Sequence, residues 1–285
     1  MAVALITGAS TGIGRATALR LARSGWTVLA GVRDSDAGEQ LAAEPGTDGR
    51  LLPLALEVTD AGQVARAAER VGELVAGRGR TPGGLDALVN NAGIGVGGPL
   101  ELVAPEDMRR QFEVNVLAQV TVTQALLPAL RRARGRIVFV SSIGGRVATP
   151  YVTPYAASKH AIEALADGLR IELSTSHVQV TLVEPGSVAT PIWDKGRAEA
   201  ERVTIPADLQ GQYGHVPAAM EKILDDTSRR GIPPEVVAAT IERALGARRM
   251  RARYLVGRDA RVLLILKRTL PDHTFDRVLR RALGV

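Results

Sequence analysis

The chain has 285 residues, which suits one large domain or two small ones, and its hydrophobic content of 46% is ample for a buried core. It has no cysteine, which excludes disulfides, thiolate nucleophiles and cysteine-ligated zinc and is compatible with a reducing, cytoplasmic location. Its formal net charge of +6 is unevenly placed, because residues 243–285 hold twelve Arg/Lys against three Asp.

This basic C-terminal region could contact anionic lipid, nucleic acid or an acidic substrate. No nucleic-acid motif accompanies its arginines, so we expect a solvated surface and no nucleic-acid partner, with peripheral membrane contact as the alternative. The longest late apolar run, residues 262–266, is far too short to cross a bilayer. Residues 2–6 already resemble a buried strand, so we expect no cleaved signal.

Short apolar runs alternate with helical stretches along the chain. The runs are nearly continuous Val, Leu, Ile and Ala, which predicts strands buried on both faces at residues 3–6, 28–32, 51–56, 87–89, 137–140 and 178–183. Helices are predicted near 13–24, 60–76, 105–133 and 152–174. This alternation predicts an α/β fold, a doubly wound parallel sheet of the Rossmann type with helices on both faces.

Residues 187–232 break this rhythm, with only weak helical stretches near 195–203 and 217–228. An insertion there would follow the carboxyl end of a strand, so we interpret it as a substrate lid, with an ordinary surface excursion as the alternative. After it we expect a helix near 234–246, a strand near 253–256 and one or two basic amphipathic helices at 258–285. No Gly/Ser linker marks a second domain, so residues 1–285 are predicted to form a single domain.

A glycine-rich loop follows the first predicted strand and opens the first predicted helix. It reads Thr7-Gly8-Ala9-Ser10-Thr11-Gly12-Ile13-Gly14, a spacing that differs from the commoner Gly-x-Gly-x-x-Gly. Glycines permit a tight turn and close backbone approach, and a helix N-terminus attracts phosphate. We therefore predict dinucleotide contacts from Gly8, Ser10, Thr11, Gly12, Ile13 and Gly14.

The end of the second predicted strand bears on the identity of the dinucleotide. An acidic residue there favours NAD, whereas an arginine accommodates the 2′-phosphate of NADP. Here Val32 stands where the acid is expected, and Arg33 and Asp34 follow. The pattern favours NADP(H), with NAD(H) possible because Asp34 could turn toward the ribose. A solvated loop arginine is the other interpretation of Arg33.

Asparagines at two places between the fourth and fifth predicted strands are candidate site residues. Asn90-Asn91-Ala92-Gly93 follows the fourth strand and suits a tight turn bordering a cofactor. Asn115 lies inside the predicted helix, where asparagine is unfavourable because it competes for backbone hydrogen bonds. It is either a tolerated polar residue or one with a role, such as holding a water.

Tyr155 and Lys159 stand four residues apart and share one face of a predicted helix, which Thr153 can cap and which Pro154 suits at its first position. A nearby ammonium lowers the pKa of a phenol, which makes the tyrosine a candidate general acid or base. Ser142 follows the fifth strand, where its hydroxyl can donate to a substrate carbonyl. The alternative is a packed tyrosine beside a solvated lysine, with Ser142 as a turn cap.

The sixth strand closes on Glu184-Pro185-Gly186, and Thr190 follows four residues after the glycine. Proline ends the strand and glycine permits close backbone approach. Thr190 could then reach a nicotinamide carboxamide.

In order and spacing, these elements resemble the compact, single-domain branch of the short-chain dehydrogenase/reductase family. The likeness covers residues 2–190 and rests on 7–14, 90–93, Asn115, Ser142, Tyr155/Lys159 and 185–190. A weaker likeness to hydroxysteroid and retinol dehydrogenases rests on Ala-Ser-Lys-His-Ala-Ile-Glu-Ala-Leu and on Glu184-Pro185-Gly186.

The resemblance implies roles for four residues in catalysis. Tyr155 would be the acid/base, and Lys159 would lower its pKa and bind the nicotinamide ribose. Ser142 would orient and polarise the carbonyl, and Asn115 would support a proton relay through water. No metal is implied.

The resemblance also implies cofactor contacts beyond the glycine loop. Thr190 and the backbone near Val188, with Pro185 and Gly186, would hold the carboxamide. Many relatives place an aspartate against the adenine after the third strand, and here Glu57, followed by Val58, stands at that position. The longer side chain is expected to shift or weaken this contact.

The function implied is an NADP(H)-dependent oxidoreductase that interconverts an alcohol and its ketone or aldehyde. Residues 191–232 match nothing closely, so the substrate is expected to be selected there. Apolar pocket candidates, which would suit a lipophilic substrate, are Ile94, Val147, Tyr151 and Trp193. A homodimer or homotetramer through the helices near 105–133 and 152–174 is also implied.

Two alternatives come from other classes. One is a non-catalytic, NADP(H)-sensing regulatory protein with the basic tail as its partner surface, but a sensor has no reason to keep all four catalytic candidates. The other is an epimerase or dehydratase, but such relatives usually carry a different glycine spacing and a larger C-terminal domain.

Overall fold

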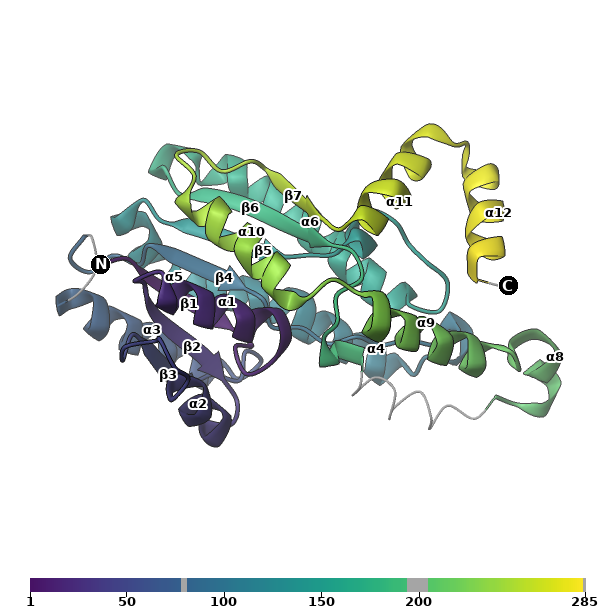
Figure 1. Ribbon diagram of the computed structural model, residues 1–285, viewed down its shortest axis with the longest axis horizontal. Helices are drawn as coiled ribbons and strands as arrows, with labels where there is room; N and C mark the ends of the chain where they lie inside the picture. Colours follow the sequence, from purple (N-terminus) through teal and green to yellow (C-terminus); the bar gives the residue numbers. More distant parts are fainter. Residues whose placement is uncertain (78–80, 194–204, 284–285) are drawn as a thin grey trace.

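The computed structural model describes residues 1–77, 81–193 and 205–283. At its centre lies a seven-stranded sheet in the order β3-β2-β1-β4-β5-β6-β7, with every neighbouring pair parallel (Figure 1). The strands are β1 Val3–Thr7, β2 Thr27–Val32, β3 Leu51–Ala55, β4 Ala87–Asn90, β5 Arg136–Val140, β6 Gln179–Pro185 and β7 Arg253–Val256. The doubly wound α/β sheet predicted from the sequence is therefore confirmed.

Helices cover both faces of this sheet (Figure 1). One layer contains α1 Gly12–Arg23, α2 Ser35–Ala42 and α10 Pro234–Gly246. The other contains α3 Ala61–Gly77, α5 Ala118–Ala133 and α6 Thr153–Glu172. Successive strand residues point to opposite faces, so in β1 Ala4 and Ile6 join the first core while Val3 and Leu5 join the second. Burial on both faces explains the continuous apolar runs of the sequence.

Helix α2 lies where the sequence predicts no helix. It has only eight residues, and Gly38 near its middle weakens the helical pattern. Asp34 caps it, because its side chain accepts a hydrogen bond from the Asp36 amide at 2.9 Å. This cap, not apolar periodicity, marks the start of the helix.

The predicted helix at 105–133 is not continuous. It divides into α4 Pro105–Phe112, a π-helical turn at Glu113–Leu117, and α5. Asn115 lies in the middle of the π-helical turn, so its unfavourable position in a helix marks a real interruption of the α-helical pattern.

The chain ends in a set of helices beyond the first six strands. They are α8 Gln210–Tyr213, α9 Val216–Arg230, α11 Arg258–Thr269 and α12 Asp272–Leu283, with short 3₁₀ turns elsewhere at Leu100–Leu102, Ile143–Gly145, Ser174–Ser176, Pro191–Trp193 and Ala207–Leu209. The predicted helix near 195–203 lies outside the described residues. In Figure 1, α11 and α12 project from the end of β7 on the side where α9 also extends. Across the ranges described, no helix is long and apolar enough to cross a membrane.

Candidate active site

Two cavities adjoin along the edge of the sheet where the parallel strands end. The first, of about 700 Å³, is lined by the segments that follow β1, β2, β3 and β4. The second, of about 660 Å³, is lined by the segments that follow β5, β6 and β7. Ile13, Asn91, Gly93, Thr190 and Ile192 line both cavities. Ligands of doubly wound sheets bind at this edge, where the strand order reverses.

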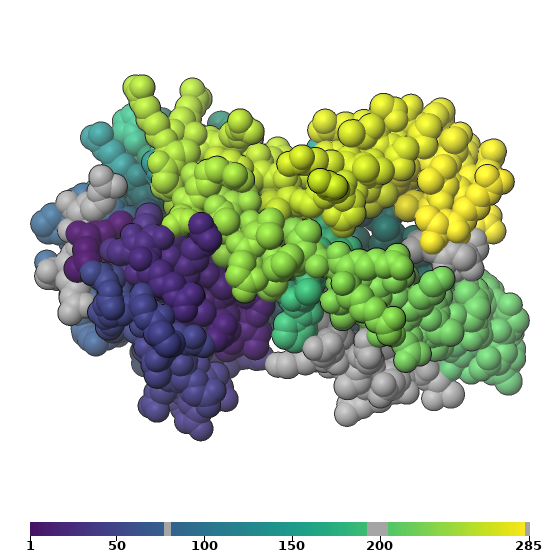
Figure 2. Space-filling view, in the orientation of Figure 1, coloured from purple at the N-terminus to yellow at the C-terminus, as the bar shows by residue number. Residues whose placement is uncertain are grey.

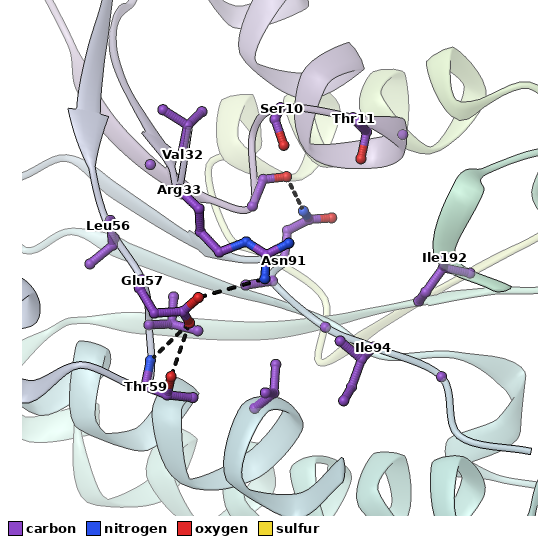
Figure 3. Close-up of a pocket in the computed structure, with 18 of the residues that line it drawn as sticks. Ser10, Thr11, Val32, Arg33, Leu56, Glu57, Thr59, Asn91, Ile94 and Ile192 are labelled. Atoms are coloured by element: carbon purple, nitrogen blue, oxygen red, sulfur yellow. Dashed lines mark hydrogen bonds and ion pairs between the residues drawn. The ribbon is translucent and has the colours of Figure 1, made fainter. Parts of the chain in front are cut away.

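The loop between β1 and α1 lines the first cavity (Figure 3). Gly8 and Gly12 have φ angles of +64° and +55°, which glycine adopts without strain. A Cβ at Gly14 would lie 2.2 Å from the Gly8 carbonyl oxygen, so α1 can approach the loop only with glycine there. Ser10 and Thr11 line the cavity where α1 begins, at the positive end of its dipole. These residues fit the phosphates of a dinucleotide.

Arg33 and Glu57 face one another across the first cavity (Figure 3). The Arg33 guanidinium lies 3.6 Å from the Glu57 carboxylate, and 61% of the Arg33 side chain is exposed. Asp34 instead caps α2 through Asp36, so the alternative in which Asp34 turns toward the ribose finds no support in its contacts.

The Glu57 carboxylate is held by protein groups. One oxygen accepts hydrogen bonds from the Thr59 amide (3.3 Å) and hydroxyl (3.0 Å), and the other faces Arg33. Val58, the next residue, is buried and also lines the cavity. Glu57 thus lines the first cavity, and its two carboxylate oxygens contact Arg33 and Thr59.

Asn91 fastens the glycine loop to the end of β4. Its side-chain amide donates to the carbonyl oxygens of Thr7 (3.0 Å) and Gly8 (3.1 Å). The Thr7 hydroxyl accepts in return from the backbone amides of Asn91 and Ala92, both at 3.0 Å. The turn at residues 90–93, predicted to border a cofactor, therefore also holds the glycine loop in place. Gly93 lines both cavities.

The second cavity brings together Ser142, Tyr155 and Lys159. Ser142 lies two residues after β5 and caps the short 3₁₀ turn Ile143–Gly145, because its hydroxyl accepts a hydrogen bond from the Gly144 amide at 3.0 Å; it is a cap as well as a pocket residue. It also hydrogen-bonds to Tyr155. Helix α6 carries Tyr155 and Lys159; Val152 is its N-cap residue and makes no side-chain cap bond, so the predicted Thr153 cap is wrong.

Burial raises the pKa of Tyr155, and the hydrogen bond with Ser142 opposes this rise only in part. The direction is opposite to the lowering predicted from the Tyr155/Lys159 spacing. The Lys159 ammonium lies 5.7 Å from the centre of the Tyr155 ring and donates to the Val140 carbonyl oxygen at 2.8 Å. Because that contact points the ammonium toward β5, removal of the phenol from water outweighs the attraction of its charge.

Lys159 is almost fully buried, with 3% of its surface exposed. Burial lowers its pKa to about 8, and the negative charge of Glu163 opposes this shift. Near neutral pH the ammonium form therefore still predominates, and it can donate to groups in the cavity.

The side chain of Asn115 is occupied by protein groups. Its oxygen accepts from the Ile94 amide at 2.9 Å, and its NH₂ donates to the Ile94 carbonyl (3.0 Å) and to the Ser158 hydroxyl (3.1 Å). The Ser158 hydroxyl in turn donates to the Tyr155 carbonyl oxygen at 2.7 Å. Asn115 thus positions the loop after β4 and the first turn of α6, and its role in a proton relay through water stays a prediction.

The loop after β6 contains the other predicted cofactor contacts. Pro185, Gly186, Val188 and Thr190 all line the second cavity. Thr190 also meets the glycine loop, because a Cβ at Gly12 would lie 3.1 Å from the Thr190 methyl. Thr190 therefore stands at the junction of the two cavities, where a dinucleotide would pass from one to the other.

Of the apolar pocket candidates, Val147 and Tyr151 line the second cavity, whereas Ile94 lines the first. The Trp193 side chain lies outside the described part of the chain. Tyr151 has a φ of +65°, and its hydroxyl lies 3.3 Å from the ring nitrogen of His215.

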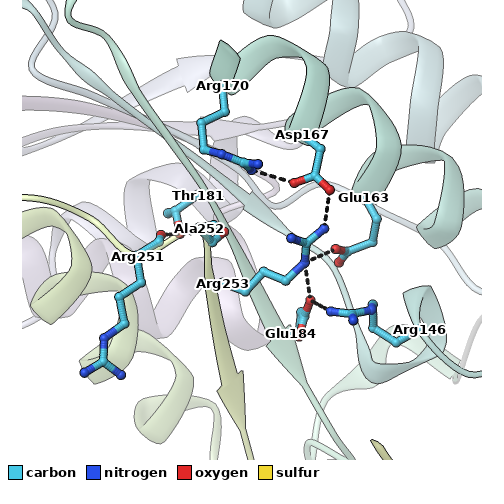
Figure 4. A network of polar contacts seen from close by, with 9 residues as sticks. All are labelled: Arg146, Glu163, Asp167, Arg170, Thr181, Glu184, Arg251, Ala252 and Arg253. Atoms are coloured by element: carbon cyan, nitrogen blue, oxygen red, sulfur yellow. Dashed lines mark hydrogen bonds and ion pairs between the residues drawn. The ribbon is translucent and has the colours of Figure 1, made fainter. Parts of the chain in front are cut away.

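A charge network centred on Arg253 joins α6 to β6 and β7 (Figure 4), and its Glu163 lies one helical turn after Lys159 on α6. Arg253 of β7 contacts carboxylates of Glu163 (2.9 Å), Asp167 (2.5 Å) and Glu184 (3.0 Å), and Arg146 contacts Glu184 at 3.0 Å. Burial, more than the neighbouring Glu184 charge, raises the pKa of Glu163 to about 7, while Arg253 opposes the rise. The network joins α6, β6, β7 and the turn after β5, which surround the second cavity.

Sequence reasoning missed several residues that shape the site. Thr7, Ser158 and Gln111 are buried polar groups whose hydrogen bonds hold the loops, and Asp259 binds the loop after β6. Ser158 carried a usable signal, because it directly precedes Lys159. Gln111 carried none, since its contacts to Ile94 and Val96 cross a turn of the fold.

The glycine loop, the adjoining cavities and the Ser142–Tyr155–Lys159 group define a dinucleotide-dependent oxidoreductase site. Comparison with known proteins agrees: the family model for short chain dehydrogenases matches residues 2–201. The chain belongs to the short-chain dehydrogenase/reductase family and is an NAD(P)-dependent oxidoreductase.

Similar proteins cover nearly the whole chain. It is 33% identical to the NADPH-dependent 3-dehydrocapnine reductase of Ornithobacterium rhinotracheale, over 99% of this chain and 98% of that protein. It is 37% identical to retinol dehydrogenase 5 of Mus musculus, over 96% of this chain and 86% of that protein. A short-chain dehydrogenase from Burkholderia cenocepacia in complex with NADP has a TM-score of 0.72 and 26% identity, over 100% of this chain and 98% of that chain.

Proposed function

We propose that this protein is an NADP(H)-dependent oxidoreductase that interconverts a lipophilic alcohol and its ketone or aldehyde. The observation that carries the proposal is the position of Ser142, Tyr155 and Lys159 in a largely apolar cavity that shares lining residues with the cavity at the glycine loop. The names of two similar proteins support it, since one is an NADPH-dependent reductase and another is a retinol dehydrogenase.

Bound nicotinamide supplies the hydride for carbonyl reduction and accepts it in the reverse direction. Ser142 and Tyr155 hold the substrate oxygen by hydrogen bonds, and the Tyr155 hydroxyl gives or takes the proton on that oxygen. Donors preorganised toward an oxygen that gains negative charge stabilise the transition state. The Lys159 ammonium, which lies beside Tyr155 in the same cavity, would hold the nicotinamide ribose when the cofactor is bound. Asn115 keeps α6 and the loop after β4 in register.

A substrate lid and an oligomer interface are the expected surroundings of the site. The stretch 205–232 acts as the described part of a substrate lid, because Met220, Ile223, Leu224 and Thr227 of α9 line the second cavity. The large exposed apolar side chains of Leu117, Leu165 and Ile171 lie on the helices expected to form a homodimer or homotetramer, which supports that assembly. A cytoplasmic location is part of the same proposal.

The proposal is tested by mixing the protein with NADPH and a panel of lipophilic ketones and aldehydes. We expect loss of absorbance at the nicotinamide band with at least one of them, and oxidation of the matching alcohol with NADP⁺. NADPH binding without turnover of any compound in the panel would overturn the proposed lipophilic carbonyl substrate and favour the NADP(H)-sensing alternative.

The cofactor preference has its own test in Arg33. An arginine hydrogen-bonded to a phosphate contributes about 1.5–3 kcal/mol, so Arg33→Ala should raise KM for NADPH by roughly tenfold or more and change KM for NADH much less. Glu57→Gln removes the carboxylate that competes for the guanidinium and should move the NADPH/NADH ratio in the opposite direction. An unchanged ratio in Arg33→Ala would contradict the proposed NADP(H) preference.

A further inference from the structure

The second cavity has a polar end and an apolar end. Ser142, Tyr155 and Lys159 form the polar end. The apolar end is bounded by two helices from distant parts of the chain. Helix α9 contributes Met220, Ile223 and Leu224, and helix α11 contributes Val262, Leu263 and Leu266. The C-terminal extension is therefore part of the cavity wall and not only a charged surface.

Asp259 fixes α11 to the loop after β6. Its carboxylate accepts a hydrogen bond from the Ser187 amide at 2.7 Å. A Cβ at Gly186 would lie 2.4 Å from both carboxylate oxygens, and a Cβ at Gly257 would lie 2.4 Å from one of them. The two glycines leave room for the carboxylate in this position, because a side chain at either would displace it. The first turn of α11 is thus locked to the same loop that is expected to hold the nicotinamide carboxamide.

The apolar end of the cavity is open to solvent. Val262 lines the cavity yet is 57% exposed, so its side chain stands at the rim. Figure 2 shows a hollow between the yellow C-terminal helices and the green helix α9. Exposed apolar surface continuous with a catalytic site is surface that a bound substrate covers. An open end sets no limit on the length of that substrate, and flexible aliphatic walls suit a flexible chain.

We propose that α9 and α11 form a corridor for an extended hydrocarbon chain, and that Asp259 is the positioning residue that holds the α11 wall. The substrate is then a carbonyl compound, or its alcohol, with the reacting carbon at one end of an unbranched apolar chain. This inference rests on the proposed oxidoreductase function and adds the shape of its substrate to it.

The test measures kcat/KM for straight-chain aldehydes from butanal to tetradecanal with NADPH, beside a steroid ketone as a rigid competitor. Burial of a methylene contributes about 0.8 kcal/mol, so each methylene that enters the corridor should raise kcat/KM by up to about fourfold until the chain reaches the open end. The steroid ketone should be a poorer substrate than the long aldehydes.

Variants on α11 locate the effect. Leu263→Ala and Leu266→Ala should lower the ratio of kcat/KM for tetradecanal to that for butanal by roughly tenfold, mainly through KM. Ile265→Ala is the matched control, because Ile265 lies on the same helix but is 59% exposed and does not line the cavity. Asp259→Ala should lower the same ratio, and Asp259→Asn, which keeps an acceptor for the Ser187 amide, should restore much of it.

Three outcomes overturn the inference while leaving the oxidoreductase intact: a kcat/KM independent of chain length, a preference for the steroid ketone, or equal effects of Leu263→Ala and Ile265→Ala. If the wild type reduces no carbonyl, the proposed function fails and the corridor is tested by calorimetric binding of 1-dodecanol in the presence of NADP⁺. Binding that is lost in Leu263→Ala supports the corridor, and no binding to the wild type overturns it.

Discussion

Replacing Tyr155 with phenylalanine is expected to lower kcat by two to four orders of magnitude, because a positioned general acid or base contributes about 10²–10⁴ to the rate. The substitution removes one hydroxyl and keeps the ring, so packing against Gly144 should be preserved. The Lys159 ammonium keeps its hydrogen bond to the Val140 carbonyl oxygen. NADPH affinity, measured by fluorescence titration, should therefore change far less than kcat.

Ser142→Ala serves as a companion variant for this prediction. It removes the hydrogen bond to Tyr155 and one donor to the substrate oxygen, and loss of one such donor typically lowers kcat by about 10²–10³. It should also shift the pH profile of kcat/KM, which reports the free enzyme, to higher pH, because the bond to Ser142 lowers the pKa of Tyr155. A Tyr155→Phe variant that keeps more than about a tenth of wild-type kcat would show that another group transfers the proton.

The parts of the site that the sequence predicts well are those in which each signal is local. The glycine loop directly follows β1, and Tyr155 and Lys159 lie one helical turn apart, so spacing alone brings each set together. The strand order then brings the ends of β1, β4 and β5 to one edge. This is why residues 2–190 suffice to predict the doubly wound sheet and why the predicted site residues meet at one edge of it.

The parts that the sequence does not predict depend on contacts between distant segments. Asp259 and Ser187 are 72 residues apart, and Arg253 and Glu163 are 90 residues apart. Spacing along the sequence cannot predict such pairs. In a basic C-terminal region, Asp259 looks like an ordinary solvent-exposed charge. The predicted lowering of the Tyr155 pKa was wrong for a related reason. The burial that raises this pKa depends on the whole pocket and not on the position of Lys159 alone.

Replacing Arg253 with methionine is expected to destabilise the protein by about 3–5 kcal/mol at pH 8, because removing one partner of a buried ion pair leaves uncompensated charge. Methionine keeps the apolar stem, but Glu163 and Glu184 are each at most 5% exposed and lose the Arg253 cation, although Glu184 keeps its ion pair to Arg146. Urea unfolding measures the change. Arg170→Met is the matched control, since Arg170 pairs with the partly exposed Asp167 and this substitution should cost less than about 1 kcal/mol.

The pH dependence of this loss identifies its cause. Burial raises the pKa of Glu163 from 4.5 to about 7, so between these values the folded protein binds a proton that the unfolded chain releases, and stability falls as pH rises. Arg253 lowers this pKa, so in its absence the pKa of Glu163 in the folded protein rises further. The pH range over which stability falls then becomes wider. Arg253→Met should therefore be much less destabilising at pH 5.5, where Glu163 is neutral, than at pH 8. Equal destabilisation at both values would mean that lost packing, not the Glu163 charge, is responsible. Since that same charge opposes the lowering of the Lys159 pKa, a confirmed pH dependence would also connect the network behind α6 to the charge state of the active site.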